Sequence, residues 1–145
     1  MKKVIITFLV LLSLLAGAAS FLPTSQKSLI SEVFVEPTYN SLSGREGSDG
    51  EILVVKIDDT TAARPQIGID RADIVYIEQV EGGLTRLAAI FSSEIPTLIG
   101  PIRSARISDI EILAQFGRVV FAYSGAQSKL LPVISAANLN DYGAQ

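Results

Sequence analysis

Residues 52–57, ILVVKI, consist almost entirely of aliphatic side chains, and the expected fold class is built around them. A short apolar run rich in β-branched residues predicts a strand that is buried on both faces. The next segment, DDTTAARPQIG at 58–68, is expected to be a loop, because the residue before a proline avoids helical backbone. The first strand of a folded domain is therefore expected at residues 52–57.

Two alternating segments after this loop predict a β-hairpin. Successive side chains of a strand point to opposite faces, which would place Ile74, Tyr76, Glu78 and Val80 on one face of residues 74–81, and Leu87, Ala89 and Phe91 on one face of residues 85–92. The Gly82-Gly83 pair between them allows a tight turn with positive φ. The pair could also let a ligand approach the backbone, although a hairpin turn is sufficient to explain it.

Helix and strand signals follow each other in the last third of the chain. Ser108 and Glu111 have capping-box spacing and accompany an apolar stripe, which predicts a helix that stops near Gly117. RVVFAY at 118–123 predicts a strand, and residues 127–136 predict a second helix. Because Pro132 interrupts that helix, it is either kinked or begins only at about Leu131. Residues 138–145 carry no stop signal, so we expect the chain to end inside an incomplete domain, residues 51–145.

The N-terminus has the layout of a secretory signal. Lys2 and Lys3 precede an apolar run at 4–15, and the small residues AGAAS follow it. We expect residues 1–19 to be a signal peptide or, alternatively, an N-terminal membrane anchor. Residues 20–50, rich in Ser and Gly, are expected to form a flexible linker, in which the apolar island at 33–35 could dock as an edge strand.

The composition of the 145-residue chain excludes several functions. It contains no His, Cys or Trp. Histidine-based triads, thiolate nucleophiles, zinc sites, iron–sulfur sites and disulfides are therefore ruled out. The formal net charge of −3 argues against a nucleic-acid partner. We expect neither a cofactor nor a metal site.

The most suggestive candidate binding residues are four arginines: Arg64, Arg86, Arg103 and Arg106. All are expected in loops or at strand ends, where guanidinium groups beside free backbone N–H groups would hold a phosphate or a carboxylate. The alternative is that each arginine pairs with a nearby carboxylate and only fixes a loop. Further candidates for the ligand site are Gly82, Gly83 and Ser124, the last of which stands between a strand and a helix.

Three carboxylates are weaker candidates for catalysis: Asp58, Asp59 and Glu78. Asp58 or Asp59 with Glu78 could act as general acid and base in a hydrolase of envelope glycans, provided that burial separates their pKa values. Such oxygen ligands would also suit Ca²⁺ or Mg²⁺. Loop carboxylates that pair with the arginines are the simpler interpretation, so catalysis is the less favoured hypothesis.

Four motifs together carry a resemblance to a known family: ARPQIG at 63–68, ADIVY at 72–76, VEGGLTR at 80–86 and GPIRSAR at 100–106. In their order and spacing the chain resembles the YerB-like family of bacterial envelope proteins, whose amino-terminal domain has no established function. The resemblance implies a mixed α/β (α+β) domain of the three-layer ββα sandwich type, exported and often lipid-anchored. This chain lacks the cysteine that would carry the lipid.

These observations predict an exported binding or scaffold module of the cell envelope, either extracellular or on the outer face of the cytoplasmic membrane. Its partner would be an anionic envelope polymer or a small anionic ligand. The membrane would be a second partner if the N-terminal segment is not cleaved.

Overall fold

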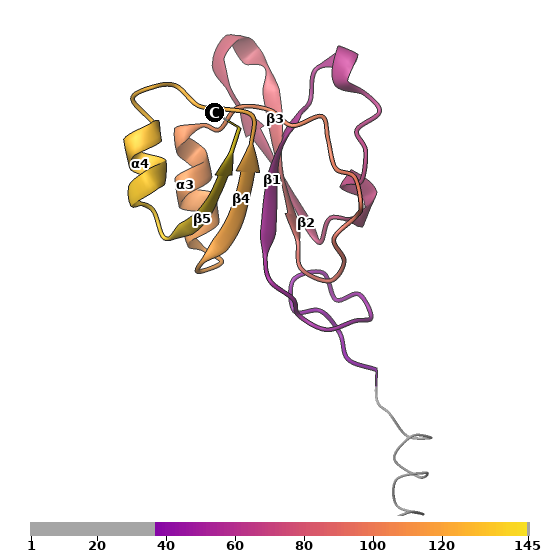
Figure 1. Ribbon diagram of the computed structural model, residues 1–145. Helices are drawn as coiled ribbons and strands as arrows, with labels where there is room; N and C mark the ends of the chain where they lie inside the picture. Colours follow the sequence, from indigo (N-terminus) through magenta and orange to yellow (C-terminus); the bar gives the residue numbers. More distant parts are fainter. Residues whose placement is uncertain (1–36, 145) are drawn as a thin grey trace, which may run out of the picture. The chain divides into compact units, whose positions relative to one another are not determined.

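The computed structural model describes residues 37–144, which are built around a five-stranded sheet of order β2-β3-β1-β4-β5 (Figure 1). The strands are β1 (Leu53–Asp58), β2 (Ile74–Gln79), β3 (Thr85–Phe91), β4 (Val119–Tyr123) and β5 (Leu139–Gly143). β3 is antiparallel to β1 and β2, whereas β4 is parallel to β1 and β5. The α-helices are α3 (Ile107–Ala114) and α4 (Leu131–Ala136). The expected α+β class is confirmed, and in the described residues it takes the form of one sheet with one helical layer.

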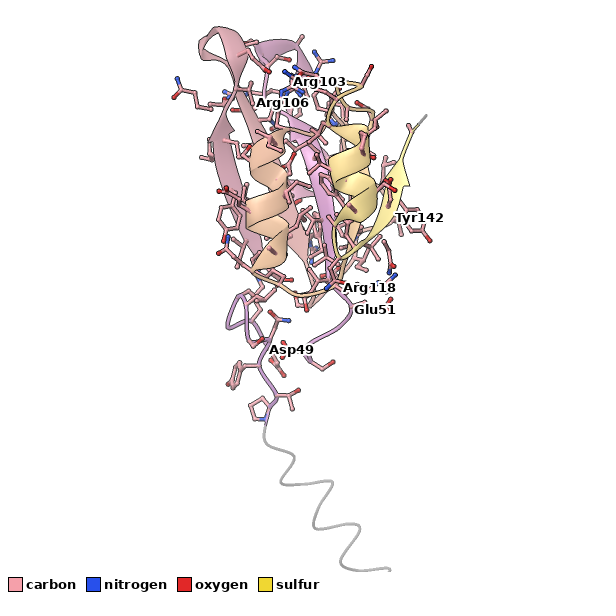
Figure 2. All side chains as sticks on the ribbon, turned by 90° about the vertical axis from the view of Figure 1, so that its left-hand side faces the viewer. Asp49, Glu51, Arg103, Arg106, Arg118 and Tyr142 are labelled. Carbon is pink, nitrogen blue, oxygen red and sulfur yellow. The ribbon has the colours of Figure 1, made fainter. Side chains whose placement is uncertain are left out.

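Both α-helices cover the same face of the sheet (Figures 1 and 2). Leu113 of α3 and Ile134 of α4 belong to one buried cluster with Val54 of β1 and Phe121 of β4. Burying an aliphatic side chain of this size contributes about 1.5–3 kcal/mol. Apolar packing on the two central parallel strands therefore fixes the position of the helices.

Loop segments cover the opposite face of the sheet. Val55 and Ile57 of β1 lie there with Phe91 of β3, and Ile69 and Ile99 from the loops pack against them. Short 3₁₀ turns, η1 (Thr61–Ala63) and η2 (Ile69–Arg71), lie in the first of these loops. β1 is thus buried on both faces, which confirms the prediction from its apolar run.

The hairpin of β2 and β3 is confirmed, together with its turn. A further 3₁₀ turn, η3 (Glu81–Gly83), joins the strands, and φ is 72° at Gly82 and 73° at Gly83. Side chains with a Cβ rarely adopt this backbone. A Cβ added at either glycine would meet no atom within 4 Å, so conformation and not close packing explains the glycine pair.

The C-terminal part contains a strand that the sequence pattern did not predict. Residues 139–143 form β5, which pairs in parallel with the whole of β4, from Val119 opposite Leu139 to Tyr123 opposite Gly143. α4 begins at Leu131 with Pro132 in its first turn, where the missing N–H of proline costs no helical hydrogen bond. This confirms the second of the two alternatives for that helix.

The capping of α3 differs from the expected capping box. Arg106 is the residue before the helix, and its backbone N–H donates to Asp109 Oδ2 at 2.6 Å. Ser108 instead lies within the first turn, and its hydroxyl donates to Glu78 Oε2 at 2.5 Å. The predicted Ser108–Glu111 capping box was therefore wrong, because Glu78 of β2 accepts the hydrogen bond from the serine hydroxyl.

Part of the expected linker is packed onto the sheet. Asn40 is buried, and its Nδ2 donates to Ser92 Oγ at 3.2 Å just beyond the end of β3. Its Oδ1 accepts hydrogen bonds from the backbone N–H groups of Leu42 and Ser43, which closes a turn. The expected signal segment, residues 1–19, and the island at 33–35 lie outside the described residues. Neither α-helix of residues 37–144 has the length and apolar character needed to cross a membrane.

Candidate anion-binding site

The candidate site lies where the two central parallel strands end. β1 and β4 pair from Leu53–Val120 to Val55–Ala122. Beyond this point, residues 103–105 connect the strand ends: Arg103 N–H donates to Lys56 O at 2.8 Å, and Arg103 O accepts from Ser124 N–H at 3.0 Å. In sheets of this kind, ligands commonly bind at the carboxyl ends of the strands. We call this region, with Arg86, Arg103 and Arg106, the arginine edge.

Three of the four predicted arginines come together at the arginine edge. Arg86 lies opposite Asp58 in the β1–β3 register, and its Nη1 donates to Ser104 O at 2.6 Å. Burial lowers the pKa of Arg86, and the nearby positive charges of Arg106 and Arg103 lower it further. Three guanidinium groups therefore lie close to one another at this edge, together with the carboxylates Asp58 and Glu81, which act on the pKa of Arg86 in the opposite direction. Figure 2 shows Arg103 and Arg106 beside each other at one end of the helical layer, with Arg118 at the other end.

The carboxylates at this edge engage only part of each guanidinium group. Arg103 Nε lies 3.4 Å from Asp58 Oδ2, and half of the Arg103 side chain is exposed. Arg106 Nε donates to Glu81 Oε2 at 2.9 Å. A guanidinium group has five N–H donors, so the contact through Nε engages only one of the donors of Arg103 among residues 37–144.

Arg64 does not join the other three arginines. Its Nη2 donates to Asp59 Oδ1 at 2.7 Å, and Asp59 also accepts the hydroxyl of Thr85. The hydrogen bond from Thr85, followed by the contacts with Arg64, lowers the pKa of Asp59. For Arg64 the alternative interpretation, in which an arginine fixes a loop, describes the geometry better.

The three predicted carboxylates are separated. Asp58 and Glu78 lie on the helix-covered face, each opposite Arg86 in its own strand pair, whereas Asp59 follows the end of β1 and contacts the loop. Arg86 therefore stands between Asp58 and Glu78. Among residues 37–144, no group of three or more carboxylates is placed to hold a metal ion.

A buried lysine beneath the edge was missed by the sequence analysis. Lys56 is fully buried in β1, and its ammonium donates to Glu78 and, at 2.7 Å, to Asp109 Oδ1. Two carboxylates thus meet one cation, and hydrogen bonds from Arg106 and Ser108 satisfy their remaining oxygens. The signal was the single lysine inside an otherwise apolar run, because a buried lysine requires acidic partners.

The two carboxylates around Lys56 have opposite pKa shifts. Burial raises the pKa of Asp109 to about 6, and attraction by Lys56 only partly offsets it. Burial also acts on Glu78, but the hydrogen bonds from Lys56 and Ser108 outweigh it, so the pKa of Glu78 lies below its usual value. Near pH 6, therefore, Asp109 is the group that gains or loses the proton.

The remaining predicted ligand residues differ in their position. Gly82 and Gly83 are exposed at the tip of the hairpin, and their backbone conformation accounts for them. Ser124 lies at the arginine edge itself, since its N–H donates to Arg103 O and its side chain is exposed. Of these three residues, therefore, Ser124 is the one that contacts the backbone of an arginine at this edge.

A cavity of about 440 Å³ opens beside Arg106, between the start of α3 and the segment that leads into α4. We call it the α3–α4 cavity. Its polar lining comprises Glu81, Arg106, Gln127 and Lys129, and its apolar lining comprises Ala105, Ile107, Leu130 and Val133. The volume lies in the range of small-molecule sites in proteins, about 300–1,000 Å³.

Comparison with known proteins places this domain in a family. Residues 41–145 match the family described as "Protein of unknown function (DUF3048) N-terminal domain". The chain belongs to this family. The match begins at the turn around Asn40 and includes the arginine edge, the buried lysine and the α3–α4 cavity.

The most informative relatives are a sequence and a solved structure from Bacillus subtilis. Over 54 residues the chain is 46% identical to "Putative lipoprotein YerB" of strain 168, a stretch that covers 37% of this chain and 16% of that protein. The crystal structure of YerB superposes with a TM-score of 0.68 at 27% identity, covering 73% of this chain and 38% of that one. The chain therefore spans less than half the length of these relatives, and the resemblance to YerB-like proteins is confirmed.

Proposed function

We propose that this domain is an exported binding module of the cell envelope that holds an anionic group at the arginine edge. The single observation that carries the proposal is the meeting of Arg86, Arg103 and Arg106 where β1 and β4 end. Among residues 37–144, Asp58 and Glu81 are the only carboxylates within salt-bridge distance of these three guanidinium groups, which leaves the positive charge of Arg86 without an ion-pair partner. A bound phosphate or carboxylate would compensate it.

The class of ligand follows from the donors. Arginine presents a planar set of N–H groups that match two oxygens of a carboxylate or phosphate, and such charge-assisted hydrogen bonds are stronger than neutral ones. The side chain of Arg103 is half exposed, so it can contact a group that remains attached to a polymer. An anionic envelope polymer or a small anionic molecule both satisfy these requirements.

Export is the second part of the proposal. It is supported by the basic and apolar start of the chain and by the relative that bears the name lipoprotein. A reporter enzyme fused behind residues 1–25 should leave the cytoplasm of a bacterial host. A fusion that stays in the cytosol at full length contradicts export.

Anion binding is tested by calorimetric titration of the purified chain with inorganic phosphate and with a poly(glycerol phosphate). Arg103→Glu should weaken binding of both by at least tenfold, because it removes an exposed guanidinium and adds a negative charge. Arg118→Glu is the matched control, since it makes the same charge change at the opposite end of the helical layer (Figure 2). Equal affinity in the wild type and Arg103→Glu contradicts the site.

A hydrolase that uses Asp58 and Glu78 is the alternative from another class. It requires both carboxylates to reach one substrate, but Lys56 and Ser108 already engage the two oxygens of Glu78. We therefore favour binding. Asp58→Asn and Glu78→Gln should abolish release of reducing ends from cell-wall glycan if the hydrolase is correct. Under the binding hypothesis, no reducing ends are released even by the wild type.

A further inference from the structure

The α3–α4 cavity combines an apolar wall with a cationic rim. From this combination we infer that the ligand is an amphipathic anion, in which a phosphate or carboxylate head is attached to a hydrocarbon chain. The head would lie against Arg106 and Lys129, and the chain against Ile107, Leu130 and Val133. This inference rests on the proposed function and specifies its ligand.

Part of the apolar wall is open to solvent. Ile107, the first residue of α3, is 64% exposed, and Val133, in the first turn of α4, is 40% exposed. Leu130, which is buried, forms the part of the wall that belongs to the core. A hydrocarbon chain lying on this wall would remove the exposed surface of Ile107 and Val133 from water, which is a favourable change roughly proportional to the area covered.

The rim carries an excess positive charge. Lys129 has no carboxylate within salt-bridge distance among residues 37–144. Glu81 accepts hydrogen bonds both from Arg106 and from the side-chain amide of Gln127. Two cations and one carboxylate therefore line the cavity, next to the positive charges of Arg86 and Arg103. This distribution favours an anionic head and disfavours a cationic or neutral one.

A second cavity shows that the combination is specific to one side of α4. It measures about 680 Å³, and its lining includes Leu131, Pro132 and Ser135 together with Tyr123 and Asp141. Among residues 37–144, Asp141 is the only charged residue in that lining, so the described part of the chain offers no cation to an acidic head there. The larger cavity therefore serves as an internal reference for the smaller one.

The inference is tested with three probes on the full-length chain: inorganic phosphate, octyl phosphate, and octyl glucoside as the uncharged amphiphile. Below the micellar concentration, octyl phosphate should bind at least tenfold more tightly than inorganic phosphate, and octyl glucoside more weakly than octyl phosphate. The backbone amide resonances of Ile107 and Val133 should shift with octyl phosphate and not with inorganic phosphate.

Matched variants locate the two parts of the ligand. Val133→Ser should remove most of the gain of octyl phosphate over inorganic phosphate, a loss of about tenfold if one valine contact is lost. Leu131→Ser is its control, because Leu131 is equally exposed, at 41%, but lines the other cavity. Lys129→Gln should weaken octyl phosphate binding several-fold, whereas Arg118→Gln should not.

The outcomes separate this inference from the proposed function. If inorganic phosphate binds in an Arg103-dependent way but octyl phosphate binds no more tightly, the inference is overturned and the anion site stands. If neither phosphate binds, both fail. Two further outcomes also overturn the inference. The first is binding of octyl glucoside with the same affinity as octyl phosphate. The second is binding to phosphatidylglycerol vesicles without binding to monomeric octyl phosphate, because the cavity would then not hold a single anionic chain.

Discussion

Two regions of this domain use the same chemistry, a basic side chain beside acidic ones, and differ in exposure. Lys56 is fully buried, and its ammonium donates to Glu78 and Asp109. Arg103 is half exposed and touches Asp58 through Nε at 3.4 Å. In the interior, losing one partner leaves a charge without water, whereas at the surface water replaces the partner. We therefore expect the stability of the folded state to depend on the Lys56 cluster and only weakly on the carboxylate partner of Arg103, which leaves Arg103 available for the anion that we propose.

The largest loss of folding stability is expected from Lys56→Met. It leaves the buried Glu78 without its cation, and breaking a buried ion pair in this way costs about 3–5 kcal/mol. Urea unfolding at pH 7 measures the loss. Arg64→Met, which breaks the exposed pair with Asp59, is the control and should cost less than about 1 kcal/mol. Similar free energies of unfolding for both variants would show that burial does not distinguish the two regions.

The second prediction concerns the pH dependence of the buried cluster. The pKa of Asp109 is about 6 in the folded protein and near 3.8 when unfolded, so the folded state binds its proton more tightly. The contribution of Asp109 to stability is therefore full below pH 4 and falls as pH rises toward 6, by about 3 kcal/mol at most. Relative to Asp109→Asn, the wild type should be more stable at pH 4 than at pH 7, as measured by urea unfolding.

Asp73 is the control for this pH dependence, because its pKa is lowered on folding and its contribution to stability should change with pH in the opposite direction. Burial raises its pKa, but the hydrogen bonds that it accepts outweigh burial and hold the pKa at about 2. Its contribution is thus present above pH 4 and lost as pH falls toward 2. Relative to Asp73→Asn, the wild type should gain stability as pH rises from 2 to 4. Parallel curves for the two aspartates would contradict the assignment of the buried proton to Asp109.

A smaller loss of stability is expected from Arg86→Met. Arg86 lies between the two regions, opposite Asp58 on one side and Glu78 on the other. The variant removes the hydrogen bond to Ser104 O, and a hydrogen bond from a charged group contributes about 1.5–3 kcal/mol. Relief of repulsion from Arg103 and Arg106 offsets part of this loss, so we expect about 1 kcal/mol. A loss as large as that of Lys56→Met would place Arg86 with the buried cluster.

The smallest effect on stability is expected from Arg103→Ala. The Arg103 side chain is half exposed, and its contact with Asp58 is long, at 3.4 Å. The free energy of unfolding should therefore change by less than about 1 kcal/mol. Phosphate affinity should nevertheless fall, because the variant removes donors at the arginine edge. A variant that loses several kcal/mol of stability would show that Arg103 holds the strand ends together through its side chain.

Local signals in the sequence were sufficient for much of the fold. The apolar run at 52–57 predicted a strand buried on both faces, Gly82-Gly83 predicted the hairpin turn, and Pro132 allowed a helix that begins at Leu131. Each of these features depends on a residue and its immediate neighbours. β5 was not predicted, since LNDYG has no apolar alternation and is a strand because it pairs with β4.

The candidate site could be predicted only in part. Arginines at strand ends were recognisable, but nothing in the sequence distinguished Arg64, which pairs with Asp59, from Arg103 and Arg106. Lys56 was visible as a single charge in an apolar run, whereas its partners Glu78 and Asp109 come from a different strand and from a helix. The α3–α4 cavity needs residues from η3, α3 and the start of α4 at once.

The order of most elements, the hairpin and the family thus follow from the amino-acid sequence, because they depend on short-range patterns of side-chain size, polarity and backbone freedom. Which charges are buried, which arginines share an edge and where an apolar wall stays open become clear only in the folded domain. Electrostatic and apolar contacts act through space and not along the chain. Residues such as Lys56 and Asp109, far apart in the chain, acquire their partners only when the strands and helices have packed.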